Sequence, residues 1–332
     1  MARIGINGLG RIGRAALKII LDTPGLEFVA VNDIAPIDVM AYLLKYDTVY
    51  GRYERDVAAE GSTLVIDGMA YPYLSERNPA DLPWGELGVD IVIESTGFFT
   101  KREDAEKHIQ AGAKYVVISG PTKSEGTPMV VHGVNTDDGK VAVFSCASCT
   151  TNCITPVVEV MGRRIGVAKA VMTTLHGYTS TQALVDSPNK KDVRRGRAAA
   201  ANFVPTTTGA AIATTKVMPQ YVGKFDGIAV RAPIPVGSIA DITFLTTRDT
   251  TVEEVNAIFR EEAATERYKN ILAATDAPLV SSDIVGDSHA SVVDLSMTKV
   301  VDGNLVKVMS WYDNEWGFTH QMIRQIVELA KV

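Results

Sequence analysis

Apolar and polar positions in the first half of the chain alternate between two patterns. Ala2–Ile6 is a short apolar-rich run, and Arg11–Leu21 follows it with apolar residues at helical spacing. Pro24 and Gly25 predict a turn, after which Phe28–Val31 predicts a second buried strand. Buried strands separated by helices indicate a parallel, doubly wound sheet.

Two more buried strands are predicted later in this half, at Ile91–Ile93 and Val116–Ile118, with a helix between them that starts near Lys101. Ile66–Met69 carries an Asp-Gly pair between two alternating segments, and this pair is a strong short-range signal for a β-hairpin. We therefore expect a hairpin inserted into the strand–helix alternation.

The second half has longer strands, typical of a mixed or antiparallel sheet. Strands are predicted at Val167–Leu175, Ile228–Arg231, Ile239–Leu245 and Leu305–Ser310, and helices after Gly209, across Glu253–Ala264 and from Thr319. A helix also begins near Cys149–Asn152, where we expect the domain boundary. The predicted organisation is a first domain at residues 1–149 and a second, α+β domain at 150–318, with the final helix (319–332) packing back on the first.

Length and composition support two ordinary globular domains. The chain has 332 residues, 46% hydrophobic and 22% charged, and a formal net charge of −6. The negative charge argues against a nucleic-acid or anionic-membrane partner, and no run of about 18 apolar residues predicts a membrane span. The start MARIGING lacks signal-peptide features, and three closely spaced cysteines do not suggest a disulfide framework. These features indicate a cytoplasmic protein.

A glycine-rich segment between the first strand and the first helix is one candidate site. Gly8, Gly10 and Gly13 have the spacing G-x-G-x-x-G, and Asp33 follows about 20 residues later, at the offset of a ribose-binding acid. The glycines let the backbone approach a pyrophosphate at the helix N-terminus, and the carboxylate would repel the 2′-phosphate of NADP. The pattern predicts an NAD-binding domain of the Rossmann type. The alternative is a glycine-rich turn that only caps a structural helix.

A cysteine at the start of a predicted helix is the second candidate. Cys149 follows an apolar strand, and the helix dipole and nearby N–H groups would stabilise its thiolate. His176 is the candidate base, because it ends the predicted strand Val171–Leu175 and would project at a sheet edge rather than in the core. The alternative for His176 is a structural histidine.

Two other interpretations of the cysteines compete with catalysis. Cys146, Cys149 and Cys153 resemble part of a metal-ligand set, but the sequence has no second Cys or His pair at zinc spacing, so we predict no metal site. Buried structural thiols are the other interpretation, and it is the better one for Cys146 and Cys153.

Six motifs along nearly the whole chain resemble one family, in its order. They are Gly5–Gly8, Leu43–Asp47, Glu94–Gly97, Ala147–Asn152, Pro205–Ala210 and Trp311–Gly317. With them the chain resembles the phosphorylating glyceraldehyde-3-phosphate dehydrogenases. The resemblance implies a homotetramer that oxidises glyceraldehyde 3-phosphate with NAD and inorganic phosphate to 1,3-bisphosphoglycerate, in glycolysis or gluconeogenesis.

The resemblance also implies residue roles, with Cys149 attacking the aldehyde and His176 moving protons. For the cofactor it implies Gly8, Gly10, Arg11, Ile12, Gly13, Asp33, Arg77, Ser119 and Asn314. For the substrate phosphate it implies Arg231 and Thr179, and for the attacking phosphate Ser148, Thr150, Thr208, Gly209 and Arg195. Surface ion pairs and turn hydrogen bonds are the alternative explanation for these arginines, threonines and Asn314.

Departures from the family pattern bear on cofactor choice. Ser187 stands where many NAD-specific members have leucine, which removes apolar crowding near the adenosine ribose and leaves room for some use of NADP. Ile34, which follows Asp33, is a bulky apolar residue of the kind seen in family members that use NAD, so NAD remains the expected cofactor. Two alternative functions remain: an erythrose-4-phosphate dehydrogenase, in which water opens the thioester, and a non-catalytic binding relative.

Overall fold

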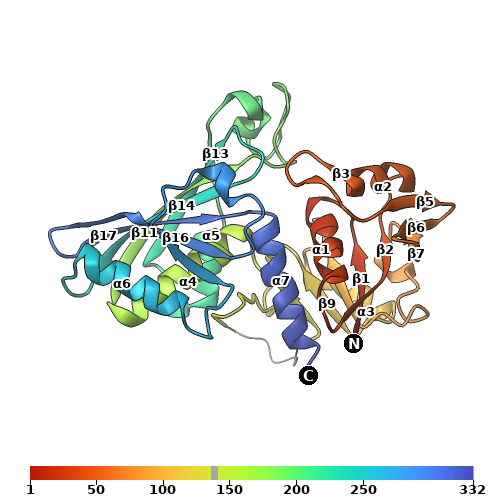
Figure 1. Ribbon diagram of the computed structural model, residues 1–332, viewed down its shortest axis with the longest axis horizontal. Coiled ribbons are helices and arrows are strands. Elements are labelled where there is room, and N and C mark those ends of the chain that lie inside the picture. The colour runs from red at the N-terminus through yellow and green to blue at the C-terminus, as the bar shows by residue number, and fades with distance from the viewer. Residues whose placement is uncertain (136–140, 332) are drawn as a thin grey trace. The chain divides into compact units, whose positions relative to one another are not determined.

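The computed structural model describes residues 1–135 and 141–331, which form two compact units (Figure 1). The described residues 1–130, 141–147 and 322–331 form one unit, and residues 131–135 and 148–321 form the other. The main stretch of the second unit therefore begins at Ser148, directly before Cys149.

The first unit contains an eight-stranded sheet in the order β10-β9-β8-β1-β2-β7-β6-β5. Its strands are β1 (Ala2–Asn7), β2 (Leu26–Asn32), β5 (Val57–Glu60), β6 (Thr63–Ile66), β7 (Met69–Leu74), β8 (Ile91–Glu94), β9 (Tyr115–Ile118) and β10 (Val143–Ser145), while β3 (Tyr46–Asp47) and β4 (Gly51–Arg52) pair separately. All neighbours from β10 to β7 are parallel, which confirms the predicted parallel sheet.

The inserted hairpin is confirmed as well. β6 and β7 pair antiparallel, with Ile66 opposite Met69. Asp67 (φ 49°) and Gly68 (φ 78°) both have left-handed backbone, as a type I′ turn requires. Glycine adopts this conformation without a Cβ clash and aspartate tolerates it, so the Asp-Gly pair sets the turn.

Three helices connect the strands of the first unit: α1 (Arg11–Leu21), α2 (Ile37–Lys45) and α3 (Arg102–Gln110). The apolar stripe of α1 is buried, as its periodicity predicts; Ala16 and Ile20, for example, have almost no exposed surface. Burying this stripe fixes the start of α1 beside the end of β1, where the glycine-rich segment lies.

The second unit has a seven-stranded mixed sheet in the order β12-β13-β11-β14-β17-β16-β15. Its strands are β11 (Val167–Gly177), β12 (Val204–Thr207), β13 (Phe225–Ala232), β14 (Ser238–Thr246), β15 (Leu272–Thr275), β16 (Ser291–Val301) and β17 (Leu305–Tyr312). β11 pairs parallel with β13 and antiparallel with β14, which confirms the expected mixed sheet. The observed β11 continues past the predicted end at Leu175, and this extension changes the surroundings of His176.

Helices α4 (Cys149–Arg164), α5 (Ala210–Val217) and α6 (Val252–Ala263) pack on this sheet. The last helix, α7 (Trp316–Leu329), begins before the predicted start at Thr319. Asp313 Oδ1 accepts the N–H groups of Glu315 and Trp316, and a side-chain acceptor at this place starts a helix. Within the described residues, no helix has the length and apolar character needed to cross a bilayer.

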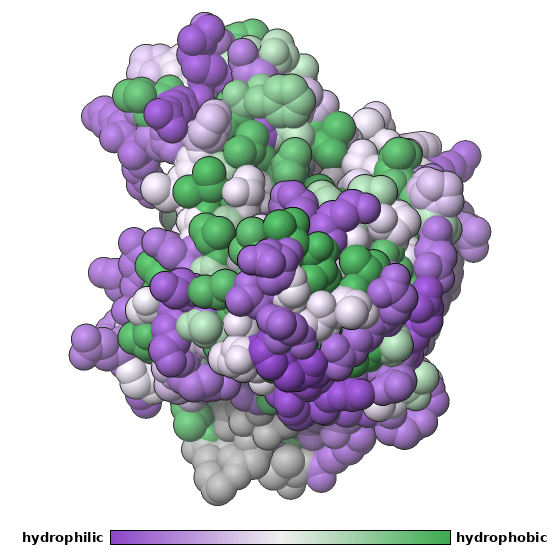
Figure 2. Space-filling view, turned by 90° about the vertical axis from the view of Figure 1, so that its left-hand side faces the viewer, coloured by the Kyte–Doolittle hydropathy of each residue, from purple (hydrophilic) through white to green (hydrophobic). Residues whose placement is uncertain are grey.

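The sheet of the second unit has a covered face and an open face. Along β11, Thr174 and His176 are buried, whereas Val171 and Leu175 are exposed, because successive side chains of a strand point to opposite faces. The covered face packs against α4. In the view of Figure 2, which is turned by 90° from that of Figure 1, hydrophobic residues (green) are exposed among hydrophilic ones (purple).

Candidate active site

Cys149 is the first residue of α4, and its position is set by the turn before it. Ala147 has left-handed backbone (φ 59°), which is uncommon for a residue with a Cβ and is typical of tight functional turns. Ser148 is the N-cap of α4, and its Oγ accepts the Thr151 N–H at 3.1 Å. The thiol of Cys149 is therefore held at the positive end of the helix.

His176 lies next to this thiol. The distance from Cys149 Sγ to His176 Nε2 is 3.3 Å, within hydrogen-bond range for sulfur. The expectation that His176 projects at a sheet edge is wrong. β11 is an interior strand that continues to Gly177, and His176 points to the covered face, where it is only 5% exposed. The period of two along β11 explains this burial.

Burial and charge act in opposite directions on Cys149. Burial raises the pKa of the Cys149 thiol, while the Arg231 guanidinium and the hydrogen bonds with Thr150 lower it. The positive end of α4 acts in the same lowering direction. The thiol is thus placed so that a proton acceptor and a positive charge can turn it into a nucleophile.

His176 is a neutral imidazole at physiological pH. Burial, and after it the Arg231 guanidinium, lower the pKa of His176 to about 3. Its Nδ1 lies 2.7 Å from the Gly177 carbonyl oxygen and 2.5 Å from Arg231 Nη1, which itself donates to the Gly177 oxygen at 3.0 Å.

These contacts allow both tautomers of His176. When Nδ1 donates to Gly177, Nε2 has a lone pair and can accept the proton of Cys149 Sγ. When Arg231 donates to Nδ1, Nε2 carries the hydrogen and can donate it to an oxyanion or a thiolate. The same imidazole can therefore serve as base and as acid.

The buried side chain of Tyr312 links α4, which carries Cys149, to β11, which carries His176. Tyr312 Oη lies 2.9 Å from Thr150 Oγ1 on α4 and 2.7 Å from Thr174 Oγ1 on β11. Its ring meets that of His176 edge to face, with centroids 6.0 Å apart. Tyr312 stands inside a motif of the family pattern but was not predicted as a site residue.

The residues expected to hold phosphate all lie in the second unit. Arg231 contacts His176, and its Nε is buried without a hydrogen-bond partner, as expected of a group that binds an anion. Arg195 donates to Thr206 Oγ1 at 3.0 Å and is close enough to lower the pKa of His176. Arg231 and Arg195 thus place positive charge around the imidazole.

The other expected phosphate ligands make local contacts. Thr179 Oγ1 pairs with Thr181 Oγ1 at 2.9 Å, and Thr208 Oγ1 accepts the Ala210 N–H at 3.1 Å. Gly209 is the N-cap of α5 and supplies no side-chain cap. Cys149, Thr150, His176 and Arg231 are thus brought together directly, while Thr179, Thr208 and Gly209 are not linked to them by a hydrogen bond described in the structure.

The other two cysteines, Cys146 and Cys153, are buried, as predicted. Burial raises the pKa of both Cys146 and Cys153 to about 12, so neither is a nucleophile near neutral pH. Among the residues that the structure describes, no group of three His, Cys, Asp or Glu side chains could hold a metal ion.

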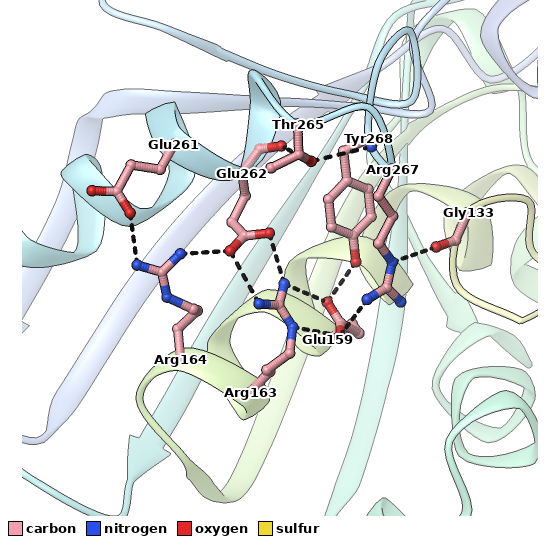
Figure 3. Close-up of polar contacts among 9 residues, drawn as sticks. All are labelled: Gly133, Glu159, Arg163, Arg164, Glu261, Glu262, Thr265, Arg267 and Tyr268. Atoms are coloured by element: carbon pink, nitrogen blue, oxygen red, sulfur yellow. Dashed lines mark hydrogen bonds and ion pairs between the residues drawn. The ribbon is translucent and has the colours of Figure 1, made fainter.

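The far end of α4 is anchored by a network of ion pairs (Figure 3). Glu262 of α6 accepts from Arg163 at 2.7 Å and from Arg164 at 2.5 Å. Arg163 also bridges to Glu159, which accepts the Tyr268 hydroxyl. Sequence analysis did not predict this network, which fixes the helix that carries Cys149 at its other end.

A second site lies within the first unit, as a cavity of about 460 Å³. It is lined by Asn7, Gly8, Gly10, Asn32, Asp33, Ile34, Glu76, Arg77, Ser95, Thr96, Phe98 and Phe99. Most of these residues stand at or just after the carboxyl ends of β1, β2, β7 and β8, where parallel sheets bind ligands. Four expected cofactor residues, Gly8, Gly10, Asp33 and Arg77, are among them.

The glycine turn fits a dinucleotide pyrophosphate. A Cβ on Gly13 would lie 2.0 Å from the Gly8 carbonyl oxygen, so this close approach of helix and turn requires glycine. Gly10 is the N-cap of α1 without a side-chain cap, and a Cβ there would meet open space. The first N–H groups of α1 can therefore be satisfied by an anion. Asp33 steadies the turn, because its Oδ2 accepts the Leu9 N–H at 2.7 Å.

The remaining expected cofactor residues are placed in different ways. Arg11 and Ile12 begin α1, and Arg11 pairs with Asp47. Ser119 follows β9 and is not among the described residues that line the cavity. Asn314 belongs to the second unit, where its Oδ1 accepts the Ser238 hydroxyl at 2.9 Å.

A parallel sheet with a nucleotide cavity, together with a cysteine–histidine–arginine centre, defines a nucleotide-dependent oxidoreductase with a thiol nucleophile. The family model "Glyceraldehyde 3-phosphate dehydrogenase, NAD binding domain" matches residues 2–102, and the model "Glyceraldehyde 3-phosphate dehydrogenase, C-terminal domain" matches residues 148–314. The chain therefore belongs to the glyceraldehyde-3-phosphate dehydrogenase family, and it is an NAD-dependent enzyme.

Curated proteins with the name glyceraldehyde-3-phosphate dehydrogenase are similar over almost their full length. The protein of Streptomyces coelicolor is 51% identical over 325 residues, which cover 97% of this chain and 96% of the relative. That of Geobacillus stearothermophilus is 48% identical with the same coverage, and that of Clostridium acetobutylicum is 45% identical over 100% of this chain and 99% of the relative.

Proposed function

We propose that this protein oxidises glyceraldehyde 3-phosphate with NAD and inorganic phosphate to 1,3-bisphosphoglycerate. The observation that supports this most strongly is the 3.3 Å contact of Cys149 Sγ with His176 Nε2, beside the partly buried guanidinium of Arg231. An aldehyde needs a nucleophile and a proton acceptor, and a phosphorylated aldehyde also needs a cation. The centre supplies all three.

The first step is the attack of Cys149 on the aldehyde carbon. The thiol gives its proton to His176 Nε2, and the sulfur forms a bond to the carbon as the carbonyl π electrons move to oxygen. His176, now protonated at Nε2, donates this hydrogen to the new alkoxide. The product is a neutral thiohemiacetal on Cys149.

Oxidation and phosphorolysis follow. When bound, NAD would supply the hydride acceptor for the thiohemiacetal carbon. His176 removes the hydroxyl proton as this hydride leaves, so that a thioester remains on Cys149. An oxygen of inorganic phosphate then attacks the thioester carbon, and the sulfur leaves as a thiolate, to which His176 returns the proton. The positive end of α4 and Arg231 stabilise this leaving group.

Two anion sites serve the two phosphate groups. Arg231 and Thr179 are proposed to bind the substrate phosphate, and the unpartnered Nε of Arg231 supports this role. Ser148, Thr150, Thr208, Gly209 and Arg195 are proposed to bind the attacking phosphate. Hydroxyl groups, backbone N–H groups and a guanidinium donate hydrogen bonds to phosphate oxygens.

The cavity of the first unit is proposed to hold NAD. Gly8, Gly10, Arg11, Ile12 and Gly13 would face the pyrophosphate, as the uncapped start of α1 suggests. Asp33 would bind the adenosine ribose and exclude a 2′-phosphate. Arg77, Ser119 and Asn314 are proposed as further ligands of NAD, and Ser187 leaves room for some use of NADP.

The domain limits, the assembly and the location are part of the proposal. Residues 1–149 and 150–318 would form the cofactor and catalytic domains, with the last helix returning to the first domain. A homotetramer is supported by exposed apolar residues on the open face of the second sheet, among them Val171, Leu175 and Ile228. Sedimentation equilibrium tests the tetramer, and a monomer at micromolar concentration would contradict it. The composition supports the cytoplasm.

The decisive test of the reaction is its dependence on phosphate. NAD reduction with glyceraldehyde 3-phosphate should continue with phosphate and stop after one turnover without it. Equal steady-state rates in both conditions would favour a hydrolytic relative such as an erythrose-4-phosphate dehydrogenase. No activity together with no binding of NAD would favour a non-catalytic relative.

A further inference from the structure

A chain of buried polar side chains lies under the cavity of the first unit and has no part in the proposed chemistry. Glu94, the last residue of β8, and His108 of α3 have no exposed side-chain surface. Trp84 is also fully buried and stands beside His108. Burying polar side chains costs free energy unless hydrogen bonds compensate for the lost water, so these side chains are expected to have a structural or functional role.

The hydrogen bonds of His108 fix its tautomer. Trp84 Nε1 can only donate, and it lies 2.9 Å from His108 Nδ1, so Nδ1 must accept. The imidazole hydrogen is therefore on Nε2, which lies 3.1 Å from Glu94 Oε2. The indole thus orients the imidazole, and the imidazole donates to the carboxylate.

Four donors converge on Glu94. Its Oε2 accepts from His108 Nε2 and from Asn7 Nδ2, the latter at 2.6 Å. Its Oε1 accepts the N–H of Thr96 at 2.9 Å and the hydroxyl of the same residue. Each carboxylate oxygen therefore uses two acceptor positions, and an isosteric amide could not accept all four hydrogens.

Glu94 is in this way linked to the lining of the cavity. Asn7 and Thr96 both line it. Asn7 Oδ1 accepts from Asn32 Nδ2 at 2.7 Å, and Asn32 in turn pairs with the backbone of Glu76. Asn7 and Asn32 end β1 and β2, Thr96 and Glu76 follow β8 and β7, and all four line the cavity.

The segment after β8 is held by the same carboxylate. Thr96 Oγ1 donates to Glu94 and accepts the Phe98 N–H at 3.1 Å. A Cβ on Gly8 would lie 2.7 Å from the Thr96 nitrogen, so the Thr96 backbone abuts the glycine turn. A shift of Glu94 would therefore move both walls of the cavity.

We propose that the Trp84–His108–Glu94 chain is a positioning device that sets the affinity of the cavity for NAD. This inference rests on the proposed function, in which the cavity holds the cofactor. Without the four donors on Glu94, the backbone of Thr96 and the amide of Asn7 have to be ordered when the cofactor binds, and this ordering weakens binding.

Glu94→Gln tests the proposal without creating a cavity. The amide places a donor against the donors of Asn7 and His108, so we expect the Kd for NAD to rise about tenfold. The KM for NAD should rise with it, while kcat and the KM for glyceraldehyde 3-phosphate change less than about twofold. Trp84→Phe, which removes the indole donor together with one ring of a fully buried side chain, should raise the Kd about threefold, and it serves as the second variant if Glu94→Gln does not fold.

Trp311→Phe is the matched control. Trp311 Nε1 donates to Asp294 Oδ2 at 3.1 Å in the second unit, so the same substitution removes the same kind of hydrogen bond elsewhere. It should leave the Kd for NAD unchanged. A nitrogen NMR spectrum of protein labelled with ¹⁵N-histidine should also show His108 with hydrogen on Nε2 only, and Trp84→Phe should shift its Nδ1 signal.

Two results would overturn the proposal. One is an unchanged Kd for NAD in folded Glu94→Gln and Trp84→Phe, which would show that Trp84, His108 and Glu94 only stabilise the core. The other is hydrogen on Nδ1 of His108 in the parent. Failure of the parent to bind NAD would instead contradict the proposed function itself, so the two failures are distinguishable.

Discussion

Glu262→Gln should destabilise the protein through the network that anchors α4. The Glu262 side chain is only 6% exposed and accepts three hydrogen bonds from Arg163 and Arg164. The amide keeps one acceptor oxygen but turns a donor toward Arg163. Hydrogen bonds to charged groups are each worth about 1.5–3 kcal/mol, but both arginines are partly exposed and keep a second carboxylate partner. We therefore expect a loss of about 1–2 kcal/mol.

The loss should depend on pH. Hydrogen bonds from Arg163 hold the pKa of Glu262 below its ordinary value, despite the opposing effect of burial. A carboxylate with a lowered folded-state pKa stabilises the protein above its unfolded pKa of about 4.3, and this contribution disappears as the pH falls through the folded-state pKa. The difference between parent and Glu262→Gln should thus be constant from neutral pH to about pH 5 and shrink below about pH 4.

Urea unfolding at a series of pH values measures this difference. Glu261→Gln is the matched control, because Glu261 also binds Arg164 but is 62% exposed, and its loss should stay below about 0.5 kcal/mol. Equal losses in the two variants, or a Glu262→Gln deficit that persists undiminished at pH 3, would refute the reasoning.

Three further substitutions test the two sites. His176→Asn should slow aldehyde oxidation by about 10²–10⁴-fold with an unchanged Kd for NAD, and a loss below about tenfold in single-turnover kinetics would remove His176 as the proton carrier. Asp33→Gly should raise the ratio of kcat/KM for NADP over NAD by about tenfold, since the repulsion between the Asp33 carboxylate and a 2′-phosphate is removed; an unchanged ratio would place selectivity elsewhere. Tyr312→Phe should cost about 1–3 kcal/mol in urea unfolding, because two threonine hydroxyls lose their buried partner. Tyr42→Phe, at a 61% exposed position, is its control and should cost less than about 0.5 kcal/mol.

Features encoded by neighbouring residues could be predicted from the sequence. The Asp67-Gly68 turn depends on the backbone preferences of two residues, and the glycine turn from Gly8 to Gly13 on the steric limits of a single loop. The parallel sheet follows from the alternation of apolar strands and helices. The cysteine at a helix N-terminus is also a local pattern, and the structure places Cys149 there.

Features that arise from strand pairing could not be predicted from the sequence. His176 was expected at an edge, because nothing in the sequence near it shows that β13 and β14 flank β11. Tyr312 lies 162 positions from Thr150 and 138 from Thr174, yet it touches both. The donors on Glu94 likewise come from three separate segments. Such contacts depend on register over the whole sheet, which the local pattern does not specify.

The central claim is that Cys149 carries the acyl intermediate. Mass spectrometry of the peptides formed after the protein has been mixed with glyceraldehyde 3-phosphate and NAD, without phosphate, tests it most directly. We predict a phosphoglyceroyl adduct on Cys149 that added phosphate removes and that is absent in Cys149→Ala. An adduct on Cys146 or Cys153, or none at all while NAD is reduced, would contradict the account.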